Sequence, residues 1–204
     1  MRLKNFEVKN LTLIEAILPR VENKVLEITK DVVLVLSFAI LTGISTKLKI
    51  EIGLIPITFQ TFAVLLSGAL LGSKKGAISQ LTYLLMGLTG LPWFARGGGI
   101  SYLLSPTFGY LLGFILAAYF VGYLVEKGWD KNFEKAVLAM FFGNVLIYIP
   151  GLFWLARFVG LGKVLSVGFY PFIIGDLLKI LLAGLALPMG WKLIKRSSNR
   201  IRNS

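Results

Sequence analysis

Six long apolar runs constrain this chain more than any other feature of its sequence. A helix needs about 20 mostly apolar residues to cross the hydrocarbon core of a bilayer, or somewhat fewer in some spans. With 56% hydrophobic residues and a mean hydropathy of +0.77, the 204-residue chain has too little polar surface for a soluble domain. We therefore predict an all-α membrane protein, a bundle of six transmembrane helices. The six runs lie at 31–46, 57–71, 76–91, 107–125, 136–158 and 172–194.

The distribution of charge predicts how this bundle lies in the membrane. The chain has 22 Lys and Arg against 10 Asp and Glu, a formal net charge of +12. Most of the basic residues fall in the N-terminal segment, the second and fourth connections and the C-terminal tail. Because basic residues collect on the cytoplasmic side of membrane proteins, both termini are predicted to be cytoplasmic. The same rule accounts for the positive charge without a nucleic-acid partner.

Cysteine and histidine are both absent from the chain. The first absence excludes disulfides, thiolate metal sites and thiol nucleophiles, and the second removes the commonest metal ligand and general base. No GxxxxGK[ST] phosphate-binding loop occurs either, so the chain is not expected to hydrolyse ATP. We expect no catalytic residues, no metal site and no cofactor.

Three segments are expected along the chain: an N-terminal amphipathic extension at 1–30, the transmembrane domain at 31–196 and a basic tail at 197–204. The stretch LTLIEAILPRVENKVLEI in the extension mixes apolar and charged residues at helical spacing, and Pro19 interrupts it. It is too charged to span a bilayer and lacks the pattern of a cleaved signal peptide. We expect it to lie on the cytoplasmic membrane surface, with docking to a partner protein as the alternative.

The last apolar run, within GFYPFIIGDLLKILLAGLALPMG, contains two charged residues, Asp176 and Lys179. Charges inside hydrocarbon are costly, so they normally pair, line a cavity or bind something. Residues three apart share a helix face. These two side chains are therefore expected to present an acceptor and a donor together at the outer end of the span. They either bind a ligand there or only neutralise each other.

Other polar residues of the spans are predicted to face the same interior. Gln60 stands at the outer end of the second span, Tyr83 midway along the third and Asn144 within the fifth, while Arg96 lies in a glycine-rich outer connection. Together they predict an outward-facing pocket for a small, partly apolar molecule. Each has a simpler alternative: a hydrogen bond between helices for the first three, and an anchor to lipid head groups for Arg96.

Four stretches of the sequence together resemble the BioY family, the biotin-binding membrane subunits of energy-coupling-factor (ECF) transporters. They are IPITFQTFAVLLSGALLG, GLTGLPWFARGGG, LLSPTFGYLLGFILAAY and YPFIIGDLLK, in this order. The combination of PITFQT, GLPWFARGGG and GDLLK is highly specific, although none of the three would suffice alone. The resemblance covers most of the chain after residue 31.

The resemblance implies a six-helix bundle that captures biotin from outside, as the substrate-binding (S) component of an ATP-driven importer in a prokaryotic cell membrane. The implied partners are a coupling membrane protein, two ATPase subunits and membrane lipid. Biotin is then a transported ligand and not a cofactor. The residues implied in biotin binding are Asp176, Lys179, Gln60, Tyr83, Arg96 and Asn144.

Two further predictions keep alternatives open. Ala39 and Gly43 on the first span have the small side chains that let helices approach closely, so they are expected either to dock the coupling protein or to serve internal packing. The function itself has alternatives in an S component for another vitamin or a biotin precursor, and in a structural membrane scaffold. An intramembrane enzyme that uses Asp176 and Lys179 as acid and base is another.

Overall fold

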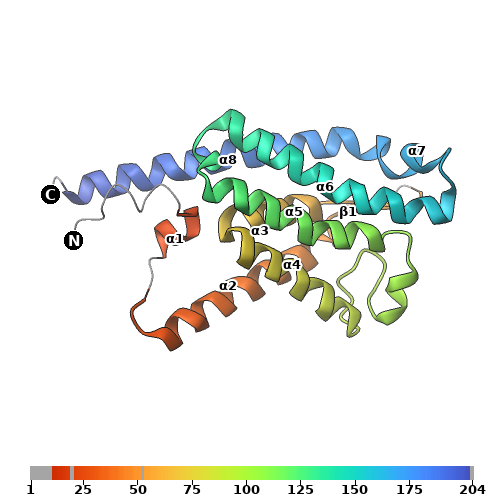
Figure 1. Ribbon diagram of the computed structural model, residues 1–204, viewed down its shortest axis with the longest axis horizontal. Helices are drawn as coiled ribbons and strands as arrows, with labels where there is room; N and C mark the ends of the chain where they lie inside the picture. Colours follow the sequence, from red (N-terminus) through yellow and green to blue (C-terminus); the bar gives the residue numbers. More distant parts are fainter. Residues whose placement is uncertain (1–10, 19–20, 52, 203–204) are drawn as a thin grey trace.

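Helices form at all six predicted positions and run side by side in an elongated bundle (Figure 1). The computed structural model describes residues 11–18, 21–51 and 53–202, with side chains up to residue 194. In chain order the helices are α1 (Leu13–Ile17), α2 (Lys24–Ser45), α3 (Gln60–Leu71), α4 (Ser73–Leu88), α5 (Phe108–Glu126), α6 (Phe133–Val159), α7 (Val164–Gly168) and α8 (Ile173–Arg202).

Three helical segments among the described residues are long and apolar enough to cross a membrane, namely Phe108–Glu126, Phe133–Val159 and Val164–Ile194. Helix α3 is also apolar, but its 12 residues extend only about 18 Å, less than the roughly 30 Å of a hydrocarbon core. The prediction of a mostly helical membrane protein is thus confirmed. The count of six spans stays a prediction.

The all-α prediction is wrong in one connection. Strands β1 (Lys49–Ile50) and β2 (Ile57–Thr58) pair antiparallel, Lys49 opposite Thr58, between α2 and α3. The β-branched residues Ile50, Ile57 and Thr58 favour extended backbone. Gly53, in the turn between the strands, has a φ of 66°, which a residue with a side chain rarely adopts.

Two helices cross the boundaries expected for the terminal segments. Helix α2 begins at Lys24, inside the expected extension, because the side-chain oxygen of Asn23 accepts hydrogen bonds from the first turn and caps the helix there. Helix α8 continues through Arg202, past the expected start of the tail. Helix ends in this chain therefore follow local capping and helix propagation, not the shift in composition.

The described part of the extension packs on the protein itself. Helix α1 starts with a reciprocal capping box, in which the N–H of Glu15 donates to Thr12 Oγ1 (3.3 Å) and the N–H of Thr12 donates to the Glu15 carboxylate (3.1 Å). Leu13 contacts Gly190 of α8 closely: a Cβ at residue 190 would lie 2.6 Å from the Leu13 side chain. The extension's predicted place on the cytoplasmic membrane surface stays a prediction. Residues 1–10 and 19–20 of the extension are outside the described part.

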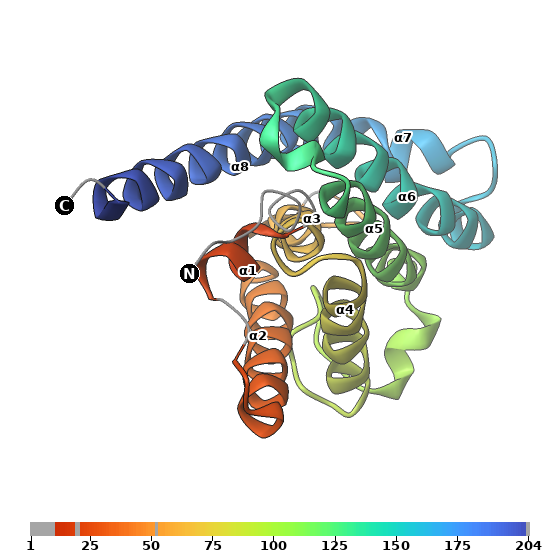
Figure 2. The ribbon, with the colours of Figure 1, turned by 60° about the vertical axis from the view of Figure 1, so that its left-hand side comes forward.

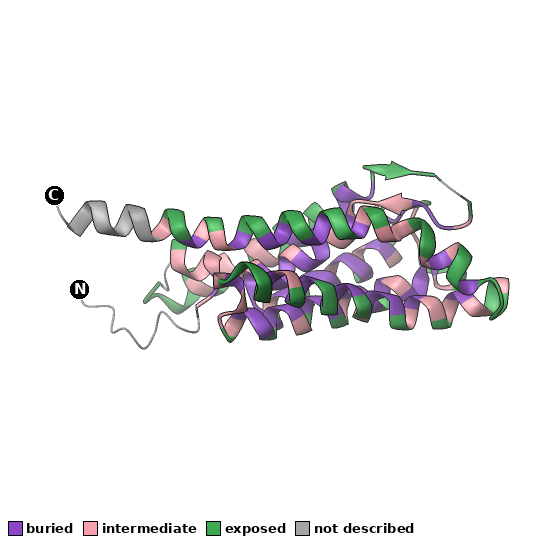
Figure 3. Ribbon diagram, turned by 90° about the horizontal axis from the view of Figure 1, so that it is seen from above, coloured by how far each residue is buried: buried purple, intermediate pink, exposed green. Residues whose placement is uncertain are grey.

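Helix α5 lies at the centre of the bundle, against α3, α4 and α6 (Figure 2). Glycine permits this packing: a Cβ at Gly68 would lie 2.3 Å from the Ala118 carbonyl oxygen, and a Cβ at Gly122 would lie 2.3 Å from the Ser73 nitrogen. Buried positions face inward on the long helices, and exposed positions follow the outer side of α8 (Figure 3). The largest fully buried side chains are Tyr83, Phe94, Leu65, Met140, Ile147, Leu155 and Leu187.

Ala39 and Gly43 both face the interior of the chain. Ala39 is fully buried, and a Cβ at Gly43 would lie 2.5 Å from the indole ring of Trp93. Both residues therefore take part in internal packing, and docking of the coupling protein at them stays a prediction. The outer face of α2 is formed instead by larger apolar side chains such as Ile40, Leu41 and Ile44.

Candidate ligand-binding site

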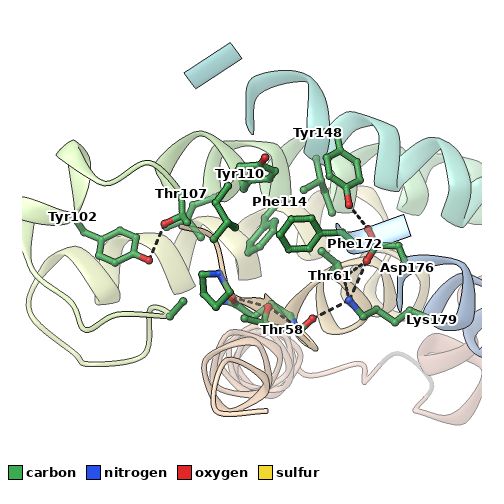
Figure 4. A pocket seen from close by; sticks show the side chains of 16 residues that line it. Thr58, Thr61, Tyr102, Thr107, Tyr110, Phe114, Tyr148, Phe172, Asp176 and Lys179 are labelled. Atoms are coloured by element: carbon green, nitrogen blue, oxygen red, sulfur yellow. Dashed lines mark hydrogen bonds and ion pairs between the residues drawn. The ribbon is translucent and has the colours of Figure 1, made fainter. Parts of the chain in front are cut away.

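An open cavity of about 580 Å³, including the space at its mouth, lies where the connections after α2 and α4 meet α3, α5, α6 and α8 (Figure 4). Sites for small molecules have volumes of this order and are mostly apolar with a few polar groups. The cavity is lined by Ile55, Pro56, Thr58, Gln60, Thr61, Ala95, Tyr102, Thr107, Tyr110, Leu111, Phe114, Ile147, Tyr148, Phe172, Asp176 and Lys179.

The predicted charge pair stands in the wall of this cavity, one turn apart on α8. Asp176 and Lys179 form a buried ion pair, with 3.0 Å between Oδ1 and Nζ. The other carboxylate oxygen of Asp176 accepts hydrogen bonds from Asn144 Nδ2 (3.0 Å) and from the Tyr148 hydroxyl. Thr61 Oγ1 lies 3.4 Å from Oδ1. The carboxylate is therefore surrounded by donors from three helices, which satisfies its charge away from water.

The ammonium group of Lys179 is satisfied as completely as the carboxylate. It donates to the Thr58 carbonyl oxygen (2.8 Å), to Thr61 Oγ1 (2.9 Å) and to Asp176 Oδ1 (3.0 Å). A lysine has three N–H donors, so all three are used within the protein. The pair thus fixes the end of β2 and the start of α3 against α8, in addition to neutralising itself.

Gln60, at the start of α3, connects this wall to the core. Its Nε2 donates to the Tyr83 hydroxyl (2.6 Å), which donates in turn to the Trp93 carbonyl oxygen (3.2 Å), and its Oε1 accepts from Thr58 Oγ1 (3.2 Å). Gln60 lines the cavity, whereas Tyr83 is fully buried behind it. The geometry makes Tyr83 a support for Gln60, not a part of the cavity wall.

A second polar group occupies the opposite end of the cavity. Thr107 Oγ1 donates to the Tyr102 hydroxyl (2.9 Å) and lies 2.9 Å from Ser105 Oγ. The rings of Tyr110, Phe114 and Phe172 line the space between this group and the ion pair (Figure 4). The cavity therefore has two polar ends and an apolar middle, a pattern that suits an elongated molecule with polar groups at both ends.

Two connections contribute residues to the cavity wall and are held together by basic side chains. Lys47 Nζ donates to the Pro92 carbonyl oxygen (2.7 Å), and Lys49 Nζ donates to that of Ala95 (2.9 Å). In the other direction, Arg96 Nη2 donates to the carbonyl oxygen of Gly53 (3.0 Å). We call the described residues of the two connections, 46–51, 53–59 and 89–99, the lid.

The structure brings most of the predicted site residues together. Asp176, Lys179 and Gln60 line the cavity, Asn144 bonds to Asp176 and Tyr83 to Gln60. Arg96 is on the lid, exposed and bonded to backbone, and it does not line the cavity.

Sequence reasoning missed three threonines, Thr58, Thr61 and Thr107, because hydroxyl groups are common in membrane spans and carry no charge to draw attention. Thr58 and Thr61 could have been found from their position, since they flank Gln60 within PITFQT.

No group of three or more acidic side chains in the described part of the chain could hold a metal ion.

Residues 14–196 match the model of the BioY family. The chain is 40% identical over 156 residues to the probable biotin transporter BioY of Lysinibacillus sphaericus, covering 72% of this chain and 80% of that protein. It is 41% identical over 150 residues to the biotin transporter BioY of Thermotoga maritima, covering 72% and 88%. Its fold matches a crystal structure of the S-component for biotin from an ECF-type ABC transporter, with a TM-score of 0.70 and 24% identity, over 84% of this chain and 95% of that one.

Proposed function

The chain belongs to the BioY family, and we propose that it captures biotin in the cavity beneath the lid as the substrate-binding subunit of an ATP-driven ECF importer. One observation carries the proposal beyond family membership. A buried ion pair stands at one end of a largely apolar cavity, with hydroxyl groups at the other end. Biotin has matching chemistry: a ureido ring, an apolar thioether ring and methylene chain, and a terminal carboxylate. The chain acts as a transporter subunit and not as an enzyme.

Asp176 and the oxygens around it accept the ureido N–H groups of biotin in this proposal. Tyr148 and Asn144 are bonded to the carboxylate and can yield to a ligand donor, because neither is charged. Lys179 keeps the carboxylate paired and in position throughout. Gln60 offers its second Nε2 hydrogen to a ligand oxygen, since Tyr83 takes only the first.

The cavity opens toward the outside of the cell, and the six helices α2, α3, α4, α5, α6 and α8 each cross the membrane. The positive-inside rule supports this topology, because basic residues are concentrated in the N-terminal segment, the second and fourth connections and the C-terminal tail. Both termini are then cytoplasmic, in the cell membrane of a prokaryote. Cysteines introduced one at a time test the orientation by chemical labelling. The unsubstituted chain has no cysteine and therefore gives no background label. A membrane-impermeant maleimide should label Leu161→Cys in intact cells and Glu134→Cys only after lysis.

Energy for uptake comes from other proteins, because the chain has no phosphate-binding loop. A coupling membrane protein and two ATPase subunits supply it in this proposal. Copurification of the chain with such proteins, and loss of biotin uptake by cells that lack them, are the expected results. Uptake against a gradient by the chain alone would contradict this part of the proposal.

Isothermal titration of the purified chain with biotin tests the binding itself. We expect Asp176→Asn to weaken binding by about 10- to 100-fold, the usual effect of removing a hydrogen bond to a charged group. Lys192→Met, which removes an exposed lysine on the same helix, is the control and should leave binding unchanged. A panel of other vitamins separates biotin from its alternatives. Failure of the folded chain to bind biotin would refute the proposal.

A further inference from the structure

The two ends of the cavity differ in the hydrogen-bond donors and acceptors that remain free for a ligand. At the α8 end, all three N–H donors of Lys179 and the hydroxyl hydrogens of Tyr148 and Thr61 are used within the protein. Besides the second amide hydrogens of Gln60 and Asn144, what remains there are oxygen lone pairs, which can only accept. No free ammonium or hydroxyl hydrogen is therefore left at this end for a ligand carboxylate.

A row of hydrogen bonds with a fixed direction reaches the cavity at its other end. The backbone N–H of Thr107 donates to Ser105 Oγ (3.3 Å). Thr107 has one hydroxyl hydrogen and donates it to Tyr102 (2.9 Å), so the bond between Ser105 and Thr107 must run from serine to threonine. Each bond polarises the next one toward the Tyr102 hydroxyl.

The hydroxyl hydrogen of Tyr102 has no acceptor among the described residues other than the oxygen that already donates to it. Tyr102 is 7% exposed, and its side chain lines the cavity (Figure 4). Its ring packs on Phe94, with 4.5 Å between the centroids, so the hydroxyl is held in place. A buried donor without an acceptor is costly, which favours a ligand that brings one.

We infer that the Tyr102 hydroxyl donates a hydrogen bond to the carboxylate of the bound ligand and so determines which end of the molecule lies beside α5. This inference rests on the proposed capture of biotin. Thr107 is the N-cap residue of the 19-residue helix α5, and the positive end of that helix dipole favours a negative group at this end of the cavity. The ureido N–H groups then meet the lone pairs at the α8 end. The apolar part of the ligand lies between Tyr110, Phe114 and Phe172.

Titration of the Tyr102→Phe variant with biotin and with biotin methyl ester tests the inference. A hydrogen bond to a charged group is worth about 1.5–3 kcal/mol and a neutral one about half of that. We expect affinity for biotin to fall at least about tenfold and affinity for the neutral ester to fall only about threefold. Tyr119→Phe, which changes an exposed tyrosine of α5, is the matched control and should alter neither affinity.

Three outcomes would overturn the inference. Unchanged biotin affinity in Tyr102→Phe would show that the hydroxyl does not contact the ligand. An equal fall for biotin and its ester would show that it donates to another oxygen. Absence of biotin binding by the unsubstituted chain would refute the proposed function as well, and this result is distinct from the other two. Thermal unfolding of Tyr102→Phe without ligand, expected to match the unsubstituted chain within a few degrees, shows that the variant is folded.

Discussion

Two buried aspartates, one at each end of the bundle, show what a ligand site requires that a structural contact does not. Asp176 is 4% exposed and has the ammonium of Lys179 and donors from Asn144, Tyr148 and Thr61 around it. Asp130, in the 3₁₀ turn η3 (Trp129–Lys131) between α5 and α6, is fully buried and accepts the indole N–H of Trp191 at one oxygen. Its other oxygen has no hydrogen-bond partner within the described residues.

The difference has an electrostatic meaning. A carboxylate that binds a ligand in a cavity has to stay charged and fixed in position. A neighbouring cation and hydrogen-bond donors on both oxygens have this effect. At Asp130 burial raises the pKa, because desolvation disfavours the charged form, and the Trp191 hydrogen bond and nearby Lys131 only partly oppose it. We infer that Asp176 belongs to the ligand site, whereas Asp130 attaches α8 to the turn before α6.

Replacing Lys179 with Met should have the largest effect, because it leaves the Asp176 carboxylate buried without its cation. Breaking one side of a buried pair costs about 3–5 kcal/mol. Unfolding of the purified variant by titration with SDS in mixed micelles measures this loss. The double variant Asp176→Leu, Lys179→Met should recover most of the stability but not biotin binding.

The double variant decides whether the pair serves only to let the helix insert. Recovery of both stability and biotin binding would show that mutual neutralisation is its whole role. If neither stability nor biotin binding recovers, the hydrogen bonds from Lys179 to Thr58 and Thr61 are themselves needed for stability, and apolar side chains do not replace them.

Trp191→Phe should have the next largest effect, at the other end of the molecule. The substitution keeps an aromatic ring on α8 but leaves Asp130 without its indole donor, which costs about 1–3 kcal/mol for a buried group. The same SDS titration measures it. Biotin affinity should not change, because Trp191 is 15 residues, or about 22 Å, along α8 from Asp176. A loss of affinity as large as that of Asp176→Asn would contradict the separation of the two regions.

These two regions also show how far the sequence predicts the molecule. Asp176 and Lys179 could be predicted because a charge in an apolar run is costly and therefore conspicuous. Asp130 could not, because EKGWDKNFEK is typical of an exposed connection, and only the fold brings Trp191 over it. The role of Tyr102 was equally hidden, since it depends on which hydroxyl hydrogen is left after its neighbours have donated. Helix positions follow apolar runs, whereas the β1–β2 hairpin depends on a turn and a few β-branched residues.

Asp130→Asn should change stability by at most about 1 kcal/mol near neutral pH but should alter its pH dependence. An acid whose pKa is raised on folding binds more protons in the folded state. Its contribution to stability therefore falls as the pH rises from its ordinary value of 3.8 to the raised folded value. Asparagine does not titrate, so the difference in unfolding free energy between the variant and the unsubstituted chain should shift in favour of the variant across this window. A constant difference would contradict the raised pKa.

Arg96→Ala should have the smallest effect on stability, at most about 0.5 kcal/mol, because the side chain is exposed and, within the described residues, hydrogen-bonds only to the Gly53 carbonyl oxygen. Its effect should appear in kinetics. If the bond between the two halves of the lid slows opening, biotin should dissociate several times faster while its association rate changes little. Stopped-flow exchange of labelled biotin measures both rates, and Arg157→Ala, at an exposed arginine outside the lid, is the matched control. A loss of affinity of 100-fold or more would instead place the guanidinium on the ligand, as the resemblance to the BioY family implies, and the lid would then have to close further around biotin than it does here.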